Sequence, residues 1–417
     1  MIRKVANPGV RHLWLWRNRS AFTGHSPREK PQLLVDISAI FQYDARTGIQ
    51  RVVRAVWSEL VRRSGRDFTV VPVYATNSGG FRYAPVNFLS DKKDSSRSEP
   101  VGAGLGDKFL GLDLSAHLLP KYRRQIQTWR ANGATVHLMV YDLLPLIRPE
   151  WFSRATVRHF HKWFDVLAHD GDQAICISDK VMQDVQRQMQ QIRVRSELPI
   201  ARVNLGGDIA GSVPSTGVPA QVSRLLERAR FCPAILMVGT IEPRKGYNVA
   251  LAAFEYLWQT QPTNAPDLII VGRPGWKTAA LQERIRLHPE QGRRLYWLED
   301  VSDEALCLLY QACRGVFVAA YDEGFGLPLL EAAAHASPVL ARDLPVFREH
   351  GLTNTIFFDD DRYPALAARL TDLLSAGQSA PSPQSLPTWS DCVDGLLKQL
   401  GLAANLPDED SLLRRAS

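Results

Sequence analysis

Two short segments in the second half of the chain combine glycine with charged side chains, as a binding site for a phosphorylated ligand would. In the first, residues 238–246, Gly239 allows a tight exit from the apolar run before it, and Pro243 stiffens the loop. Arg244 and Lys245 follow, and a guanidinium can grip a phosphate bidentately while an ammonium adds a compact charge. Such a pair could neutralise a diphosphate leaving group. A solvated basic turn before a helix explains this segment, taken alone, equally well.

The second segment, residues 323–331, places two carboxylates on either side of a Gly-Phe-Gly turn. The two glycines leave the backbone bare, and Pro328 suits the first turn of a helix, whose free N–H groups favour an anion. Glu323 lies in the loop and Glu331 on the helix, so they could accept hydrogen bonds from different hydroxyls of one extended ligand. A capped helix with a surface glutamate is the simpler explanation of this segment alone.

Both segments follow predicted strands, and strands alternate with helices through most of the chain. In the second half we expect strands at 234–238, 267–271, 294–298, 315–318, 338–341 and 355–358. In the first half we expect strands at 32–37, 68–74, 135–141 and 173–177, and helices at about 48–63, 151–168 and 179–189. Residues 75–112 read as a long loop or insertion. The alternation predicts an α/β protein with two parallel sheets, whose ligands bind beyond the carboxyl ends of the strands.

The expected domain boundaries follow from composition. We assign residues 1–30 to a basic arm, 31–212 to a first Rossmann-like domain, 213–232 to a linker, 233–385 to a second Rossmann-like domain, 386–402 to a helix that crosses back to the first domain, and 403–417 to a flexible tail. The crossing helix is expected at 388–400, with an apolar face at Trp389, Val393, Leu396, Leu397 and Leu400.

The net charge of +7 is concentrated at one end of the chain. Residues 1–30 hold seven basic side chains and one acidic one, so the rest of the chain is nearly neutral and gives no sign of nucleic-acid binding. The arm also holds Trp14 and Trp16, which suits contact with anionic lipid at the inner face of a membrane; a disordered arm is the alternative. Five cysteines without zinc-like spacing, and the lack of a signal peptide or of an apolar span, indicate a cytoplasmic protein.

In this order and about 80 residues apart, the two charged segments resemble the retaining GT-B glycosyltransferases of family 4. The resemblance covers roughly residues 31–400 and implies two Rossmann-like domains that face each other across a cleft. It implies that the domain at 31–212 lies on the acceptor side and that the domain at 233–385 binds the nucleotide sugar. It implies that Arg244 and Lys245 bind the donor diphosphate, that Glu323 lies near the donor sugar and that Glu331 binds the ribose. Further donor-binding positions that it implies are Gly48, Gly239, Gly272, Arg273, Val301, Gly324, Phe325, Gly326 and Leu327.

The first half of the chain carries the resemblance too. The segment 47–52 looks like the family's glycine loop, and 205–208 matches the end of its first sheet. The segment 141–145 looks like a His-Asp segment near the reacting carbon, but Tyr141 stands where many relatives have His, which puts any imidazole role in doubt. Asp142 is implied as a catalytic contact to the acceptor hydroxyl; a strand-end aspartate that bonds the backbone is the alternative.

The pattern looks most like bacterial surface-polysaccharide transferases, including mannosyltransferases that use GDP-mannose. The expected function is retaining transfer of a hexose, with mannose from GDP-mannose favoured, from a nucleotide-diphosphate sugar to a saccharide or lipid-linked acceptor. We expect no cofactor and no metal, since the cationic pair serves the leaving group and residues 359–361 read as a polar turn. The alternatives are another enzyme of the same fold, such as a nucleotide-sugar epimerase or a phosphorylase, and a non-catalytic subunit that binds a sugar nucleotide.

Overall fold

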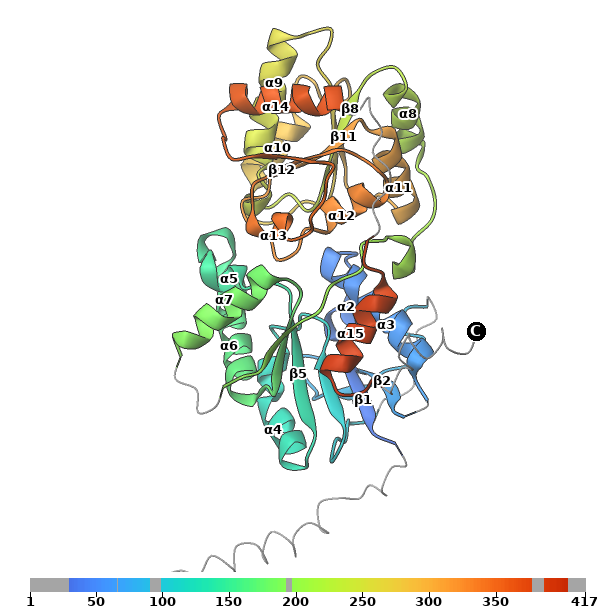
Figure 1. The fold of residues 1–417 in the computed structure, drawn as a ribbon, viewed down its shortest axis with the longest axis vertical. Helices are drawn as coiled ribbons and strands as arrows, with labels where there is room; N and C mark the ends of the chain where they lie inside the picture. The colour runs from blue at the N-terminus through green and yellow to red at the C-terminus, as the bar shows by residue number, and fades with distance from the viewer. Residues whose placement is uncertain (1–29, 66, 91–98, 193–196, 377–385, 404–417) are drawn as a thin grey trace, which may run out of the picture.

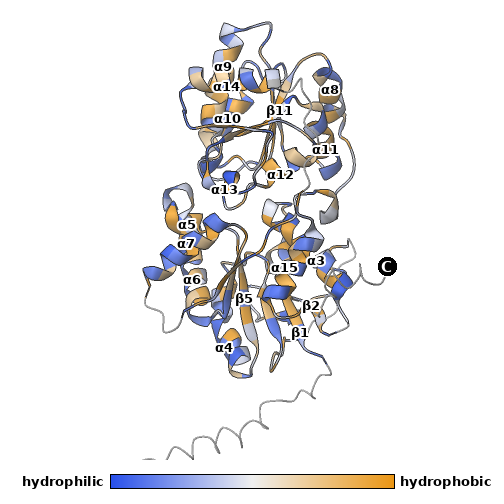
Figure 2. Cartoon of the chain, in the orientation of Figure 1, coloured by the Kyte–Doolittle hydropathy of each residue, from blue (hydrophilic) through white to orange (hydrophobic). Residues whose placement is uncertain are grey.

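The computed structural model describes residues 30–65, 67–90, 99–192, 197–376 and 386–403, which form two α/β domains (Figure 1). Nearly all of the expected basic arm and terminal tail lies outside these residues. Figure 2 shows apolar residues along the strands of both sheets and polar residues on the outer turns of the helices, as sheets covered on both faces require. Across the described part of the chain, no helix has the length and apolarity needed to cross a bilayer.

The first domain is built on a seven-stranded sheet in the order β3-β2-β1-β4-β5-β6-β7. All neighbouring strands are parallel except β2 and β3. The strands are β1 (Gln32–Asp36), β2 (Thr69–Tyr74), β3 (Arg82–Tyr83), β4 (Lys108–Gly111), β5 (Thr135–Val140), β6 (Gln173–Cys176) and β7 (Ile200–Arg202).

The prediction of a loop or insertion at 75–112 was wrong at β3, which pairs with β2, and at its end, where β4 lies in the middle of the sheet. This strand pairs with β1 on one side and with β5 on the other, and Phe109 and Leu110 are fully buried. Only four residues long, β4 follows a stretch rich in glycine and aspartate. Its strand conformation therefore depends on pairing with distant segments rather than on a local pattern.

Helices cover both faces of this sheet: α2 (Ser38–Gln42), α3 (Gly48–Arg63), α4 (Arg123–Ala131), α5 (Leu144–Ile147), α6 (Arg154–Asp170) and α7 (Asp179–Gln190). Helix α3 has the predicted bounds. It begins at a capping box, in which Thr47 and Gln50 bond each other's backbone N–H groups. Its apolar stripe, which includes Val53 and Val56, is buried against the sheet, so the helix start is held at the edge facing the second domain.

The second domain has a six-stranded parallel sheet in the order β10-β9-β8-β11-β12-β13. The strands are β8 (Ala234–Val238), β9 (Asp267–Val271), β10 (Leu295–Leu298), β11 (Gly315–Val318), β12 (Val339–Arg342) and β13 (Thr355–Phe358). The helices are α8 (Ala220–Ala229), α9 (Tyr247–Thr260), α10 (Ala279–Arg286), α11 (Asp303–Ala312), α12 (Leu327–Ala334), α13 (Pro345–Arg348) and α14 (Tyr363–Ala376). The strand order reverses between β8 and β11, and such a switch point is where open α/β sheets bind ligands.

The chain crosses between the domains twice. The interval 213–232, expected as a linker, contains α8, whose Val222 and Leu225 join the core of the second domain. The predicted terminal helix is confirmed as α15 (Trp389–Gln399), which packs beside α3 in the first domain (Figure 1). There the indole of Trp389 donates a hydrogen bond of 2.8 Å to the backbone oxygen of Asp208. The second crossing therefore ends on the first domain.

Candidate active site

The loops after β8 and β11, the two strands at the switch point, bring four charged side chains together. Arg244 Nη1 lies 2.6 Å from Glu323 Oε2, and Lys245 Nζ pairs with the other oxygen of Glu323. Arg244 Nη2 lies 2.9 Å from Glu242 Oε1. We call Glu242, Arg244, Lys245 and Glu323 the single-domain cluster, because all four belong to the second domain.

The opposite charges in this cluster stabilise each other although the side chains are buried. Burial opposes the charge of Glu323, but Arg244 and Lys245 outweigh it and lower the pKa of Glu323 to about 2. Burial likewise opposes the charge of Arg244, yet Glu323 and Glu242 raise its pKa. Burial raises the pKa of Glu242, an effect that Arg244 partly offsets. Glu323 is therefore ionised at neutral pH and occupies the cations as an anionic ligand would.

Close backbone approach explains several glycines of the predicted site. A Cβ on Gly272 would lie 1.9 Å from the oxygen of Gly239, and one on Gly324 would lie 1.9 Å from the oxygen of Tyr141. The N–H groups of Gly239 and Gly272 donate to carbonyls of the neighbouring strands, so they hold the loops together. Gly326 has a φ of 96°, which favours glycine, and immediately precedes α12. At the start of α12, Pro328 has no N–H and the N–H of Leu329 donates to the oxygen of Gly326 at 3.0 Å, which leaves the N–H of Leu327 as the one that points out of the first turn.

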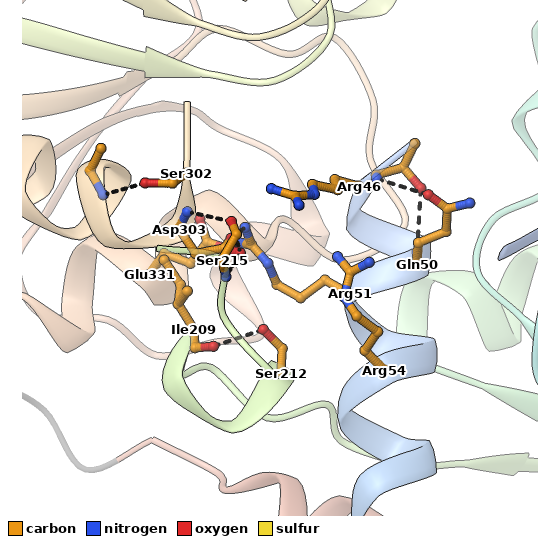
Figure 3. Close-up of polar contacts among 12 residues, drawn as sticks. Arg46, Gln50, Arg51, Arg54, Ile209, Ser212, Ser215, Ser302, Asp303 and Glu331 are labelled. Carbon is orange, nitrogen blue, oxygen red and sulfur yellow. Dashed lines mark hydrogen bonds and ion pairs between the residues drawn. The ribbon is translucent and has the colours of Figure 1, made fainter. Parts of the chain in front are cut away.

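A second cluster spans the two domains, and Figure 3 labels four of its residues, Arg51, Ser215, Asp303 and Glu331. Arg51, on α3 of the first domain, pairs with Glu331 on α12, and its Nη2 lies 2.7 Å from Asp303 Oδ1 at the start of α11. The Tyr310 hydroxyl donates to Glu331 Oε2 at 2.7 Å. Ser215 donates to Asp303 Oδ2 through its backbone N–H and its hydroxyl, both at 2.9 Å. We call these five residues the cross-domain cluster.

The carboxylates of the cross-domain cluster are largely shielded from water. The side chain of Glu331 is 3% exposed and that of Arg51 14%. Burial opposes the charge of Arg51, but Glu331 and Asp303 raise its pKa. Both oxygens of Glu331 are bonded to protein groups, so a ribose at this carboxylate would have to share it with Arg51 or displace that side chain. Arg51 falls within segment 47–52, but no role was predicted for it. The available signal was its place in the first turn of a helix that faces the cleft.

Asp142 and Tyr141, at the end of β5, point in different directions. Asp142 Oδ1 accepts the backbone N–H of Leu144 at 3.1 Å, which is the backbone-bonding alternative considered above. Burial raises the pKa of Asp142, while Arg244 opposes that shift, which places this carboxyl within electrostatic reach of the single-domain cluster. Tyr141 is buried, and its hydroxyl donates to the backbone oxygen of Leu112 at 2.6 Å. It is therefore a core residue and does not stand in for an imidazole.

The remaining predicted positions lie at the cleft or beside it. A Cβ on Gly48 would lie 3.4 Å from a methyl group of Leu327, so the starts of α3 and α12 face each other. Arg273 Nη2 lies 3.1 Å from Asp300 Oδ1, at the outer end of the same edge. Val301 is half-buried at the core of the second domain. Phe325 is buried with the core of the first domain.

The loop before α12 fixes the domains against each other. Lys180 Nζ of the first domain lies 2.7 Å from Asp322 Oδ1, and the hydroxyl of Ser178 donates to the oxygen of Gly324 at 2.7 Å. Glu349 accepts the backbone N–H groups of Asp179 and Lys180, both at 2.8 Å, at the start of α7. The side chains of both domains therefore meet around the predicted site.

The three aspartates at 359–361 do not converge. Asp361 Oδ1 lies 2.6 Å from Arg342 Nη2, and Asp360 pairs with Arg362. In the described residues no group of three or more His, Cys, Asp or Glu side chains is placed to hold a metal ion. The expectation of a metal-independent reaction stays a prediction.

The chain is similar in sequence to known glycosyltransferases. Residues 232–384 match the family described as Glycosyl transferases group 1. Two Escherichia coli proteins named serotype-specific mannosyltransferase WbdA are 38% and 39% identical over 396 and 383 residues, which are 93% and 89% of this chain. The matches cover 46% and 47% of those relatives, so the chain spans about half their length.

Solved structures share the two-domain arrangement. Sucrose-phosphate synthase from Thermosynechococcus elongatus superposes with a TM-score of 0.58 at 15% identity, covering 93% of this chain and 100% of that one. Anabaena HepE, solved in complex with UDP and glucose, superposes with a TM-score of 0.56 at 16% identity, covering 90% of this chain and 100% of that one. At these identities the likeness shows the fold alone.

Proposed function

We propose that this chain is a retaining glycosyltransferase of family 4. The premise is that it has the GT-B fold and contains a glycosyl transferases group 1 domain. The proposed reaction moves mannose from GDP-mannose to a saccharide or lipid-linked acceptor, on the cytoplasmic side, in cell-surface polysaccharide biosynthesis. The single observation that carries this proposal is the single-domain cluster. It holds two ordered cations at the switch point, where a donor diphosphate would need them.

In the proposed donor complex, the diphosphate replaces Glu323 as the partner of Arg244 and Lys245. The exchange is reasonable because Glu323 is ionised and occupies both cations with the same charge-assisted geometry that a phosphate uses. Once released, Glu323 can accept hydrogen bonds from the hydroxyls of the donor sugar. The N–H of Leu327 at the start of α12, with Gly48 opposite, donates to a remaining phosphate oxygen.

The chemical step breaks the bond between the anomeric carbon and the phosphate oxygen. Negative charge develops on that oxygen, and cations already in place stabilise it without reorganisation. The acceptor hydroxyl forms the new bond from the same face of the sugar, so configuration is retained, and its proton passes to the departing phosphate. Asp142 contacts the acceptor hydroxyl, and its raised pKa reflects its removal from water.

The nucleotide end of the donor is assigned to the cross-domain cluster and its neighbours. Glu331 accepts hydrogen bonds from the ribose, and Arg51 keeps that carboxylate charged and oriented. The base lies beside Val301 and the segment 272–273. No metal takes part in this proposal, because side chains and a helix start serve the diphosphate.

The choice of mannose rests on the relatives named mannosyltransferases. The experiment is a thermal-shift screen with GDP, UDP, ADP and dTDP sugars, followed by transfer to a mannose-terminated acceptor and assignment of the product's anomeric configuration by NMR. We expect GDP-mannose to stabilise the protein most and an α-linked product to form. Donor consumption without acceptor would point to an epimerase, and binding without turnover would point to a non-catalytic subunit.

A further inference from the structure

A hollow of about 620 Å³ lies between the first half of α6 and the loop after β9, outside the site described above. One wall comes from the first domain and the other from Lys277 of the second. The wall from the first domain follows Asp142 along the chain, after α5.

The hollow is lined by cations. Arg154, Arg158 and Lys162 are exposed and four residues apart along α6, so they lie on one helix face. None of the three forms an ion pair with a carboxylate of the described residues, and Asp165 of the same helix pairs with Arg123 and His169 instead. Lys277 adds a fourth positive charge, and the residues that line the hollow include no carboxylate.

Pro149, Phe152, Val157 and His161 form the rest of the lining, and the first three are apolar. Phe152 is only 8% exposed, and its ring centroid lies 5.8 Å from that of Trp276, which is itself 41% exposed. Val157 is half-buried on α6 between the arginines. A ligand here would meet an apolar surface beside positive charges.

Contacts between the domains hold this hollow in shape. The indole of Trp276 donates to the backbone oxygen of Trp151 at 2.8 Å, and Lys277 Nζ donates to that of Glu150 at 2.7 Å. Lys277 has a φ of 57°, a left-handed conformation uncommon for residues other than glycine. Such a conformation persists where the surroundings fix it, so this wall is a built feature rather than a loose loop.

We propose that this hollow, termed the basic hollow, binds a phosphate or diphosphate group that carries an apolar chain. The cations would bind the phosphate oxygens, and Phe152 with Val157 would pack against the first part of the chain. A neutral saccharide would leave these charges without a partner. The identification of this ligand as part of the acceptor rests on the proposed function; the binding itself does not.

The test uses the full chain with all three cations removed together, Arg154→Gln/Arg158→Gln/Lys162→Gln. The matched control, Arg224→Gln/Arg230→Gln/Arg314→Gln, makes the same charge change at three exposed sites of the second domain, away from the cleft. Both variants retain the basic residues 1–30, so that segment cannot cause a difference between them. All six residues are exposed, so both proteins should fold, and equal thermal midpoints would verify this.

The probes are farnesyl diphosphate and inorganic diphosphate, each titrated calorimetrically. We expect the control to bind farnesyl diphosphate like the wild type, and the triple variant to bind it at least about tenfold more weakly, because three charge-assisted contacts are lost. In Lys245→Ala, where the single-domain cluster no longer offers a second diphosphate site, inorganic diphosphate should bind at least about tenfold more weakly than farnesyl diphosphate, because it buries no apolar surface. Equal binding of farnesyl diphosphate by the triple and control variants would overturn the proposal, as would equal binding of the two probes by Lys245→Ala.

Two further measurements separate this proposal from the proposed function. If Lys245→Ala abolishes farnesyl diphosphate binding while the triple variant keeps it, the probe occupies the single-domain cluster and the basic hollow is not its site. GDP titrated into the triple and control variants should bind equally. If GDP binds neither variant nor the wild type, the proposed donor is wrong. The comparison of farnesyl diphosphate binding by the triple and control variants still tests whether the basic hollow is a binding site.

Discussion

The single-domain and cross-domain clusters both pair arginine with glutamate at the cleft, yet they differ in charge balance and in origin. The first has two cations and two carboxylates, all on the loops of one sheet. The second has one cation, Arg51, for two carboxylates, and that cation comes from the other domain. The first therefore suits an incoming anion that replaces one of its carboxylates. The second has more carboxylates than cations, and a carboxylate oxygen can accept a further hydrogen bond, which suits hydroxyl groups.

The origin of each cluster adds a second difference. Strands β8 and β11 are neighbours in one sheet, so the single-domain cluster can form whatever the position of the first domain. The cross-domain cluster exists only while α3 lies against α12. The rate of sugar transfer should therefore depend on the single-domain cluster. Nucleotide affinity and the arrangement of the domains should depend on the cross-domain cluster.

The largest expected effect comes from the cations of the single-domain cluster. Arg244→Ala or Lys245→Ala should lower turnover by about 10²–10³-fold, the scale for losing one preorganised contact to a developing oxyanion. The measurement is nucleoside diphosphate release in steady state, with Arg314→Ala on the opposite edge of the sheet as control. Wild-type turnover in both variants would remove these residues from the site.

The next effect is on stability and tests the cross-domain cluster. Arg51→Met keeps the apolar stem but leaves Glu331 and Asp303 without their cation, which should cost about 3 kcal/mol and lower the thermal midpoint by several degrees. The matched control is Arg54→Met on the same helix, which should cost less because its partner Asp44 is 42% exposed. Equal midpoints for the two variants would show that the cross-domain pair adds nothing.

A smaller effect separates the two glutamates in turnover. Glu323→Gln should lower kcat by about 5–30-fold, because a charge-assisted hydrogen bond to the donor sugar becomes a neutral one, worth about 1–2 kcal/mol. Steady-state kinetics with the true donor would measure it. A raised KM at unchanged kcat would mean that Glu323 binds the ground state and the transition state equally.

The last prediction is that removing metal ions leaves turnover unchanged. Activity should survive EDTA, since Arg244 and Lys245 neutralise the leaving group and Asp361 is held by Arg342. The assay is turnover before and after chelation. Complete loss that Mg²⁺ or Mn²⁺ restores would contradict this assignment and reopen a metal role for the aspartates at 359–361.

The parts of the fold that the sequence predicts well are those with local signals. Helix α3 shows a clear apolar period and a cap, and the glycine-rich loops mark the ends of β8 and β11. Strand β4 was missed because its conformation depends on partners far away in the chain.

The candidate site also has parts that the sequence predicts and parts that it does not. Residue type and spacing were enough to select Arg244, Lys245 and Glu323 as candidates, but not to find that Glu323 pairs with both cations. Arg51 lies 280 positions from Glu331, so no local pattern relates them. The inward orientation of Tyr141 likewise depends on Leu112, on a separate segment.

The distinction between the clusters is tested most directly by calorimetric titration of GDP into the wild type, Glu331→Gln and Glu323→Gln. Glu331→Gln should bind GDP about 5–30-fold more weakly, because a charged acceptor for the ribose becomes neutral. Glu323→Gln should bind GDP at least as tightly as the wild type, because the variant no longer competes for Arg244 and Lys245. If Glu331→Gln binds GDP as tightly as the wild type, the ribose assignment is wrong and Glu331 serves only to hold the domains together.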